Sequence, residues 1–256
     1  MTKIAIIGAG NMGSAIAAGL SQSNYEVVVA NPHADKLERL AAKYPSVAVT
    51  TSNAEAAAGA DIVFIATRPA QCTDVIAEVS PALSAGALVV TLAPQVGLAD
   101  IRRPAGCHAA RMMPNTAISV GESMTFVCFS EDTGEAVRAR LLDALSTLGQ
   151  TAVIDEKLMG PATALCSCGL AYALRYVRAA TEGAVAMGFR PSDAVGYICA
   201  TLQGAAAMLE QSGGHPEKLV DQVTTPGGTT IRGLLAMERA GFSNAVIEGL
   251  LASCHE

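Results

Sequence analysis

The first part of the chain, from residue 3 to about residue 150, alternates short apolar runs with segments whose apolar positions recur at helical spacing. Such alternation is typical of βαβ units, in which the strands form a parallel sheet covered by helices on both faces. We therefore predict a doubly wound parallel sheet. The predicted strands are KIAIIGAG, EVVVANP, VAVTTS, DIVFIATRP, ALVVTLAP, CHAARMMPN, MTFVCFS and TAVID.

The pattern becomes entirely helical after Glu156. One long helix is predicted to end at Gly188, and a second to open on Pro191 and close on Gly213, because proline favours first turns and glycine favours helix ends. Shorter helices follow, the last with Ser243 as its N-cap. The sequence thus predicts two domains, residues 1–157 and 158–256, the second all-α.

Both long helices are rich in Ala, Gly, Leu and Met on most of their faces. Helices that are apolar nearly all round are usually buried, and a second copy of the chain can supply the cover. We predict a dimerisation domain, and hence a homodimer or a larger homo-oligomer.

Composition narrows the class of protein. Apolar residues make up 51% of the chain and the net charge is −6, without a basic cluster, which argues against a nucleic-acid partner. No apolar run reaches the ~18 residues of a membrane-spanning helix. The seven cysteines are scattered without CxxC pairs, so we expect no metal site, mostly buried thiols, and a cytoplasmic location.

The segment IIGAGNMG places Gly8, Gly10 and Gly13 directly after the first strand and at the opening of a helix. In this context the first glycine permits a tight turn, the second lets the backbone approach a pyrophosphate, and the third lets the helix pack on the strand. The sequence therefore predicts a Rossmann-type dinucleotide site, with Asn11 and Met12 between the glycines.

The second strand ends in Asn31-Pro32-His33, where an NAD enzyme would carry an acid for the ribose hydroxyls. Lys36 and Arg39 follow, which favours NADPH, with NADH as the alternative. Two further segments lie at the carboxyl ends of predicted strands, where ligands bind in open sheets, although each also suits a helix cap or turn. These are Asn53 and the run Ala66, Thr67, Arg68 and Pro69.

The stretch VTTPGGTTIRG, residues 223–233, interrupts the helical region. One interpretation is an anion site, because a helix start offers free backbone N–H groups and the positive end of its dipole. The other is an ordinary Schellman-type loop followed by a threonine N-cap, which the residues alone favour.

Three segments in this order, IIGAGNMG, RMMPNT and HPEKLVDQVTTPGGTTIRGLLAMERAGFSNAVIEGL, resemble the pyrroline-5-carboxylate reductase family over nearly the entire chain. The resemblance implies a Rossmann domain, a helical domain that intertwines with a second subunit, and a nicotinamide hydride donor. It implies that Thr225, Gly227, Gly228 and Thr229 hold the substrate carboxylate and that Thr230 faces the ring nitrogen. The implied cofactor contacts are Gly8, Gly10, Asn11, Met12, Gly13, Asn31, His33, Asn53, Ala66, Thr67, Arg68, Pro69 and Ala93.

The chain also departs from the family pattern. The family's Ser-Gly-Ser-Gly-Pro-Ala-Tyr is here Cys166-Ser167-Cys168-Gly169-Leu170-Ala171-Tyr172, and its Ala-Gly after an earlier strand is Pro94-Gln95. The family's Lys is Arg68 and its usual Ser is Thr225. These departures bear on the substrate more than on the type of reaction.

The expected activity is reduction of the cyclic imino acid 1-pyrroline-5-carboxylate to L-proline. Three alternatives stay open: reduction of a different cyclic imine, a β-hydroxyacid dehydrogenase-like activity, and a non-catalytic NADPH-binding protein. The second is disfavoured because such enzymes need a lysine on the first long helix, and residues 160–174 contain none.

Overall fold

The computed structural model describes residues 1–254 and divides into two compact units, residues 1–167 and the residues from Cys168 onward. The sequence places the division earlier, between residues 157 and 158. The difference arises because Met159 and Ala162, although helical, are buried against Phe126 in the first unit.

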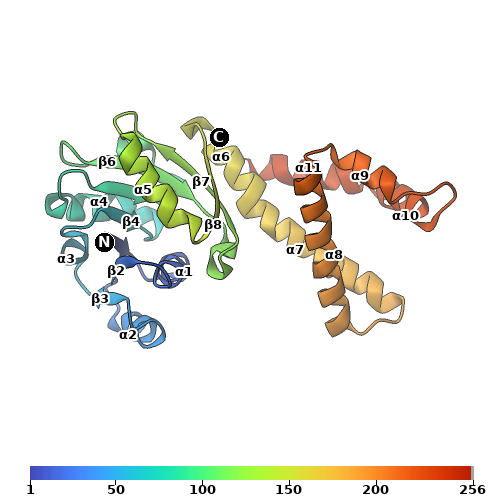
Figure 1. Cartoon of the computed structure of the whole chain (residues 1–256), viewed down its shortest axis with the longest axis horizontal. Coiled ribbons are helices and arrows are strands. Elements are labelled where there is room, and N and C mark those ends of the chain that lie inside the picture. Colours follow the sequence, from blue (N-terminus) through green and yellow to red (C-terminus); the bar gives the residue numbers. More distant parts are fainter. Residues whose placement is uncertain (255–256) are drawn as a thin grey trace. The chain divides into compact units, whose positions relative to one another are not determined.

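The first unit contains one eight-stranded sheet in the order β3-β2-β1-β4-β5-β6-β7-β8 (Figure 1). β1 pairs in parallel with β2 on one side and with β4 on the other. The strand order therefore reverses at β1, which is where open sheets of this kind bind ligands. The strands are β1 (Thr2–Ile7), β2 (Tyr25–Ala30), β3 (Ala48–Thr50), β4 (Ile62–Ile65), β5 (Leu88–Thr91), β6 (His108–Met113), β7 (Ser123–Phe129) and β8 (Gly149–Val153).

The predicted doubly wound parallel sheet is confirmed, with one exception: β7 runs antiparallel to β6. Residues 114–122 join these strands and contain only the short 3₁₀ helix η4 (Thr116–Val120). A parallel pair needs a crossover of about a dozen residues or more, so this short connection enforces the antiparallel direction.

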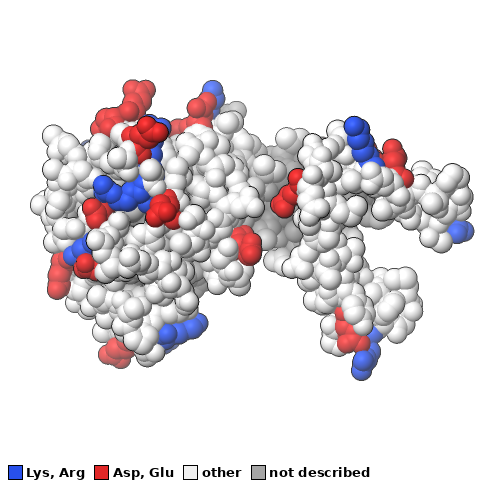
Figure 2. All heavy atoms as spheres, in the orientation of Figure 1, with Lys and Arg blue, Asp and Glu red and all other residues white. Residues whose placement is uncertain are grey.

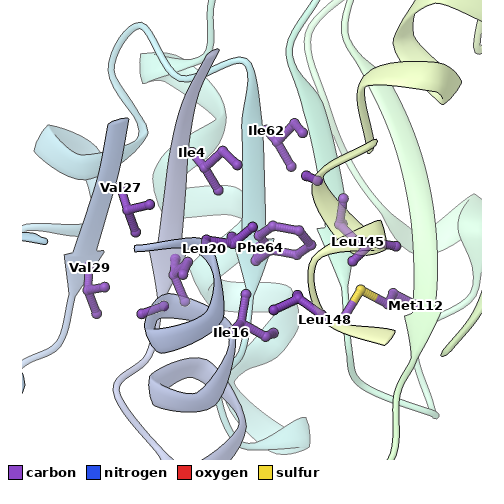
Figure 3. Close-up of a cluster of buried hydrophobic side chains, with 14 of the residues drawn as sticks. Ile4, Ile16, Leu20, Val27, Val29, Ile62, Phe64, Met112, Leu145 and Leu148 are labelled. Atoms are coloured by element: carbon purple, nitrogen blue, oxygen red, sulfur yellow. The ribbon is translucent and has the colours of Figure 1, made fainter. Parts of the chain in front are cut away.

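Helices cover both faces of the sheet. Ile4 and Ile6 of β1 point into a core shared with α1, α2 and α5, whereas Ala5 and Ile7 point into a second core shared with α3 and α4. Figure 3 shows the first core, with Phe64 at its centre. The helical elements of the first unit are α1 (Asn11–Leu20), α2 (Ala34–Lys43), α3 (Asn53–Ala57), η1 (Pro69–Gln71), α4 (Cys72–Val79), η2 (Ser80–Ala82), η3 (Leu98–Asp100), α5 (Glu135–Ser146), η5 (Glu156–Leu158) and α6 (Met159–Ala162).

The long helix predicted after Glu156 is not regular. A π-helical turn, η6 (Thr163–Cys168), separates α6 from α7, and π turns of this kind are frequent at functional sites. The helices of the second unit are α7 (Gly169–Ala186), α8 (Pro191–Ser212), α9 (Pro216–Gln222), α10 (Thr229–Arg239) and α11 (Phe242–Ser253).

The described helices of the second unit bury only three residues, Thr181, Ala184 and Ala194. Large apolar side chains are exposed instead, among them Met187 at 74% and Leu251 at 64%. Figure 2 shows broad uncharged stretches over this unit. These helices therefore lack a core of their own.

The predicted helix ends are confirmed for the two long helices. Gly188 (φ +97°) follows α7, Pro191 opens α8, and Gly213 ends α8 in the left-handed conformation. The prediction of Ser243 as an N-cap is wrong. Gly241 is the N-cap of α11, and the Ser243 hydroxyl donates a hydrogen bond to Glu238 Oε1 at 2.7 Å.

All seven cysteines are free. The expectation that most are buried is wrong, since four are half-buried or exposed, including the exposed Cys199 and Cys254 of the poorly covered second unit. Among the described residues, no helix is both long and apolar enough to cross a membrane, and no cluster of three or more metal-binding side chains occurs.

Candidate active site

The three glycines of the loop after β1 have different structural roles. Gly8 (φ +115°) donates its N–H to Ala30 O at 2.8 Å, and a Cβ there would lie 2.6 Å from Ala66 O. A Cβ on Gly13 would lie 2.0 Å from Gly8 O. A Cβ on Gly10 would meet nothing within 4 Å. Gly8 and Gly13 are therefore required by the chain's own packing, whereas Gly10 leaves open space for an outside group.

The N-terminus of α1 lies at the same place. Gly10 is its N-cap and no side chain caps the first turn, so the N–H groups of Asn11 and Met12 keep their hydrogen-bonding capacity. Together with the helix dipole, such groups favour a bound anion such as a pyrophosphate.

A cleft of ≈ 610 Å³ opens beside this helix start, at the carboxyl ends of β1, β2 and β4. Eight of the predicted contacts line it, whereas Gly13 lines none of the cavities described here and Asn11 lines a neighbouring groove. The lining residues are Ile7, Gly8, Gly10, Asn31, Pro32, His33, Lys36, Asn53, Ala66, Thr67, Arg68, Gln71, Val75 and Glu78.

A smaller cavity of ≈ 180 Å³ lies at the carboxyl ends of β4, β5 and β6. It shares Ala66 and Thr67 with the large cleft, so the two cavities adjoin at these residues. Its lining is mostly apolar and contains the predicted Met12, Pro69 and Ala93. The lining residues are Met12, Ala66, Thr67, Pro69, Leu92, Ala93, Met113 and Pro114.

Thr67 stands where the two cavities adjoin. Its hydroxyl oxygen is buried and has no hydrogen-bond partner among the described residues. A buried hydroxyl without a partner costs free energy, and this one belongs to a residue that lines both cavities although the oxygen itself is enclosed.

Asn31 is buried and joins two loops. Its Oδ1 accepts a hydrogen bond from the Ala9 N–H at 3.2 Å, and its Nδ2 donates to His33 O at 3.3 Å. The side chain thus ties the glycine-rich loop to the turn after β2, and it presents no carboxylate to the cleft.

Basic side chains of α2 continue from the cleft into a groove of ≈ 510 Å³ between α1 and α2. Lys36 lines both cavities, and it forms no ion pair within residues 1–254. Arg39 lines only the groove and is paired with Asp35 at 2.7 Å. Lys36 is therefore the more available cation beside the end of β2.

The alternative that Asn53 is a helix cap is wrong. Ser52 caps α3 by accepting a hydrogen bond from the Glu55 N–H, and Asn53 is the first helical residue. The Asn53 side chain donates to Glu78 Oε2 at 2.9 Å, and both residues line the large cleft.

Sequence reasoning missed the side of η1 and α4 that closes the cleft, formed by Gln71 at the end of η1 and by Val75 and Glu78 of α4. Their spacing of four and three residues puts them on one side of a helix, which was the signal available. It also missed Arg111, whose Nη1 pairs with Glu156 Oε1 at 2.8 Å and whose Nη2 donates to Pro94 O at 2.7 Å. This contact fixes the loop that follows Ala93.

The thiols near the cavities are not activated. Cys72 lies 3.2 Å from Thr91 Oγ1, and burial raises its pKa above the ordinary value. Burial also raises the pKa of Cys166, and burial followed by the charge of Glu156 raises that of Cys128. These groups stay protonated at neutral pH, so they do not act as thiolate nucleophiles.

In the second unit, residues 225–228 form a tight turn. Gly228 donates its N–H to Thr225 O at 3.0 Å, with Pro226 and then Gly227 (φ +67°) between them. Proline followed by a left-handed glycine is the signature of a type II turn. A Cβ on Gly228 would lie 2.5 Å from the Thr225 hydroxyl.

The start of α10 has no capping side chain. Gly228 is its N-cap, so the interpretation of this segment as a threonine-capped helix is wrong. Thr229 and Thr230 are the first two helical residues and are exposed. Arg232, which the sequence reading did not single out, donates from Nε to Gly228 O at 3.3 Å and adds a positive charge beside the turn.

Two family models match the chain. Residues 156–256 match the pyrroline-5-carboxylate reductase dimerisation model, and residues 3–95 match the coenzyme F420-dependent NADP oxidoreductase model. The chain is 33% identical to the pyrroline-5-carboxylate reductase of Escherichia coli, over 97% of this chain and 94% of that protein. It is 34% identical to pyrroline-5-carboxylate reductase 1 of Dictyostelium discoideum, over 98% of this chain but about half, 48%, of that protein.

Two solved structures of similar proteins have the same fold over nearly the whole of this chain. A Coxiella burnetii pyrroline-5-carboxylate reductase has a TM-score of 0.89 at 28% identity, with 99% of this chain and 96% of that one covered. A Plasmodium falciparum pyrroline carboxylate reductase with NADP bound has a TM-score of 0.87 at 25% identity, with 99% and 95% covered.

Proposed function

Because the chain belongs to the pyrroline-5-carboxylate reductase family, we propose that it reduces 1-pyrroline-5-carboxylate to L-proline with NADPH. The observation that carries this proposal is the open space at Gly10, beside an uncapped helix start and at the edge of the large cleft, which adjoins the smaller cavity at Ala66 and Thr67. The P. falciparum relative with NADP bound supports the choice of cofactor.

The large cleft suits the adenosine and pyrophosphate part of the cofactor. The N–H groups at the start of α1 would hold the pyrophosphate, and Lys36 would face the 2′-phosphate. The smaller apolar cavity suits the nicotinamide ring, with Met12 and Met113 among its walls. When bound there, the cofactor supplies a hydride.

The turn at residues 225–228 and the start of α10 suit the substrate carboxylate. The Gly228 N–H closes the turn on Thr225 O, so the N–H of Gly227 and those of the first helical residues, Thr229 and Thr230, would hold the carboxylate. Arg232 adds positive charge beside them. Thr230 would hydrogen-bond the ring nitrogen. In the reaction the imine carbon gains a hydride and the nitrogen ends with one proton, so the chain's task is to hold the ring within about 3–3.5 Å of the donor.

We further assign cofactor binding to the domain 1–157 and dimerisation with substrate binding to 158–256. A homodimer is supported by the family model of the second domain and by the exposed apolar side chains of its helices. The seven unpaired cysteines support a reducing compartment, the cytoplasm.

Steady-state turnover tests the function. We expect oxidation of NADPH on addition of 1-pyrroline-5-carboxylate, with a higher kcat/KM for NADPH than for NADH. Six-membered and aryl-substituted cyclic imines serve as the comparison, and faster turnover of one of them would reassign the substrate. Tight NADPH binding without turnover of any imine would instead indicate a non-catalytic protein.

A further inference from the structure

The π-helical turn η6 is fastened to the segment that leaves β6. The Ser167 hydroxyl donates a hydrogen bond to Pro114 O at 3.1 Å. In the opposite direction, Asn115 Nδ2 donates to Cys166 O at 3.3 Å. Consecutive residues of the turn therefore bind consecutive residues of the β6–β7 connection.

Asn115 is held in place by further hydrogen bonds within the chain. Its N–H donates to Ser123 Oγ at 3.1 Å, its Oδ1 accepts from the Ala117 N–H at 3.1 Å, and the residue is 8% exposed. Its neighbours Met113 and Pro114, by contrast, line the smaller cavity. By binding Pro114 O and Asn115, the turn thus holds the segment that forms one wall of that cavity.

The neighbouring residue Cys166 is half-buried and packs against the apolar cluster that contains Met113 and Met159. The turn is therefore held to the end of β6 by packing as well as by hydrogen bonds.

We propose that Ser167 is a positioning residue that fixes the Met113–Pro114 wall of the small cavity by anchoring the Pro114 carbonyl. The proposal rests on the proposed function only in its kinetic part, which assigns that cavity to the nicotinamide ring. The glycine-rich loop and Asn31 are separate from this anchor and hold the large cleft. Ser167 therefore affects hydride transfer more than affinity for the cofactor.

The variants Ser167→Ala, which removes the hydroxyl, and Ser167→Thr, which retains one, test the proposal. Ser146→Ala is the matched control, since Ser146 is also helical and donates to a backbone carbonyl, Asp143 O at 2.7 Å, but lines neither cavity. We expect Ser167→Ala to speed hydrogen exchange of the Asn115 and Ala117 amides in the cofactor-free protein. Ser167→Thr and Ser146→Ala should leave exchange there unchanged.

In turnover, Ser167→Ala should lower kcat about two- to tenfold, the effect of one neutral hydrogen bond, and leave the Kd for NADPH unchanged. The isotope effect on kcat, measured with NADPH deuterated at the transferred position, should not fall in Ser167→Ala, because hydride transfer becomes slower. Ser167→Thr should restore kcat. Unchanged amide exchange in Ser167→Ala would overturn the proposal. If the wild type reduces no imine, the proposed function fails, while the exchange experiment still decides the role of Ser167.

Discussion

Asn31 Oδ1 accepts a hydrogen bond from the backbone N–H of Ala9 at 3.2 Å, across the gap between the end of β2 and the glycine-rich loop. In such folds the residue that follows the second strand commonly contacts the cofactor's ribose. Here the same side chain also holds the glycine-rich loop, to which we assign the pyrophosphate. The two roles can be separated by substitution.

Asn31→Asp keeps an acceptor for the Ala9 N–H but places a carboxylate where a 2′-phosphate would lie. We expect the ratio of kcat/KM for NADPH to that for NADH to fall at least about tenfold, or ~1.4 kcal/mol. Asn31→Ala, the control, removes the acceptor and should weaken both cofactors alike. A preserved preference for NADPH in Asn31→Asp would place the 2′-phosphate elsewhere.

The glycines of the loop should respond differently to one added methyl group. Gly13→Ala forces a Cβ to within 2.0 Å of Gly8 O and should prevent stable folding. Gly10→Ala places its Cβ in open space, so it should cost no more than about 1 kcal/mol through its N-cap position. It should nevertheless raise the Kd for NADPH more than about tenfold, because the methyl group occupies the approach of the pyrophosphate. Thermal unfolding of both variants measures their stability, and NADPH fluorescence measures the Kd. Normal NADPH affinity in Gly10→Ala would refute the assignment of the pyrophosphate to Gly10.

Thr230→Val tests the substrate loop. Since Gly228 and not a threonine caps α10, loss of the hydroxyl should leave the melting temperature unchanged. The kcat/KM for the imine should fall about 5- to 150-fold, or ~1–3 kcal/mol of transition-state stabilisation, because the bound ring would cover the hydroxyl and the hydrogen bond to its nitrogen would be lost. The Kd for NADPH should stay constant. Thr73→Val, at the second position of α4 and likewise exposed, is the control for the added apolar surface. Wild-type turnover in Thr230→Val would exclude a contact to the ring nitrogen.

Tyr25 links the start of β2 to α5 by donating a hydrogen bond to Asp143 Oδ2 at 2.6 Å. Burial first, and then the hydrogen bond and charge of Asp143, raise the pKa of Tyr25 to about 12. Because the folded pKa lies above that of the unfolded chain, about 10, this contact contributes stability below about pH 10 and loses it as the pH rises toward 12. Asp143→Asn should lower the Tyr25 pKa only part of the way, since burial remains. Phenolate absorbance against pH, with Tyr25→Phe to identify the signal, measures the shift; an identical titration in Asp143→Asn would contradict it.

Local patterns predicted most of the fold, because the signals are local. Gly8 and Gly13 follow an apolar run, and Pro191 and Gly213 bracket an apolar helix, so each of these assignments needs only neighbouring residues. The direction of β7 could not be read in this way. Its residues are as apolar as those of β6, and the direction depends on the absence of a crossover helix between residues 114 and 122.

In the candidate site too, neighbouring residues predict positions along the chain but not contacts between distant segments. Asn31 and Thr67 could be assigned to the carboxyl ends of strands, but the bond from Ala9 to Asn31 and the unpartnered Thr67 hydroxyl depend on tertiary contacts. The π turn was also invisible, because no residue of TALCSC excludes an ordinary α-helix. Ser243 failed as a cap since Gly241, two residues earlier, already supplies the left-handed turn into α11.

The scarcity of buried side chains in the second unit has a consequence for how its stability is measured. In the proposed homodimer, a unit that buries three residues by itself would draw its folding free energy from association, and association obeys mass action. Its melting temperature should therefore climb with the logarithm of protein concentration, and each tenfold dilution withdraws ~1.4 kcal/mol from assembly. Loss of activity on dilution would then result from dissociation of the chains. A fall in specific activity at nanomolar enzyme would measure the dissociation constant of the assembly rather than a change in the rate of catalysis.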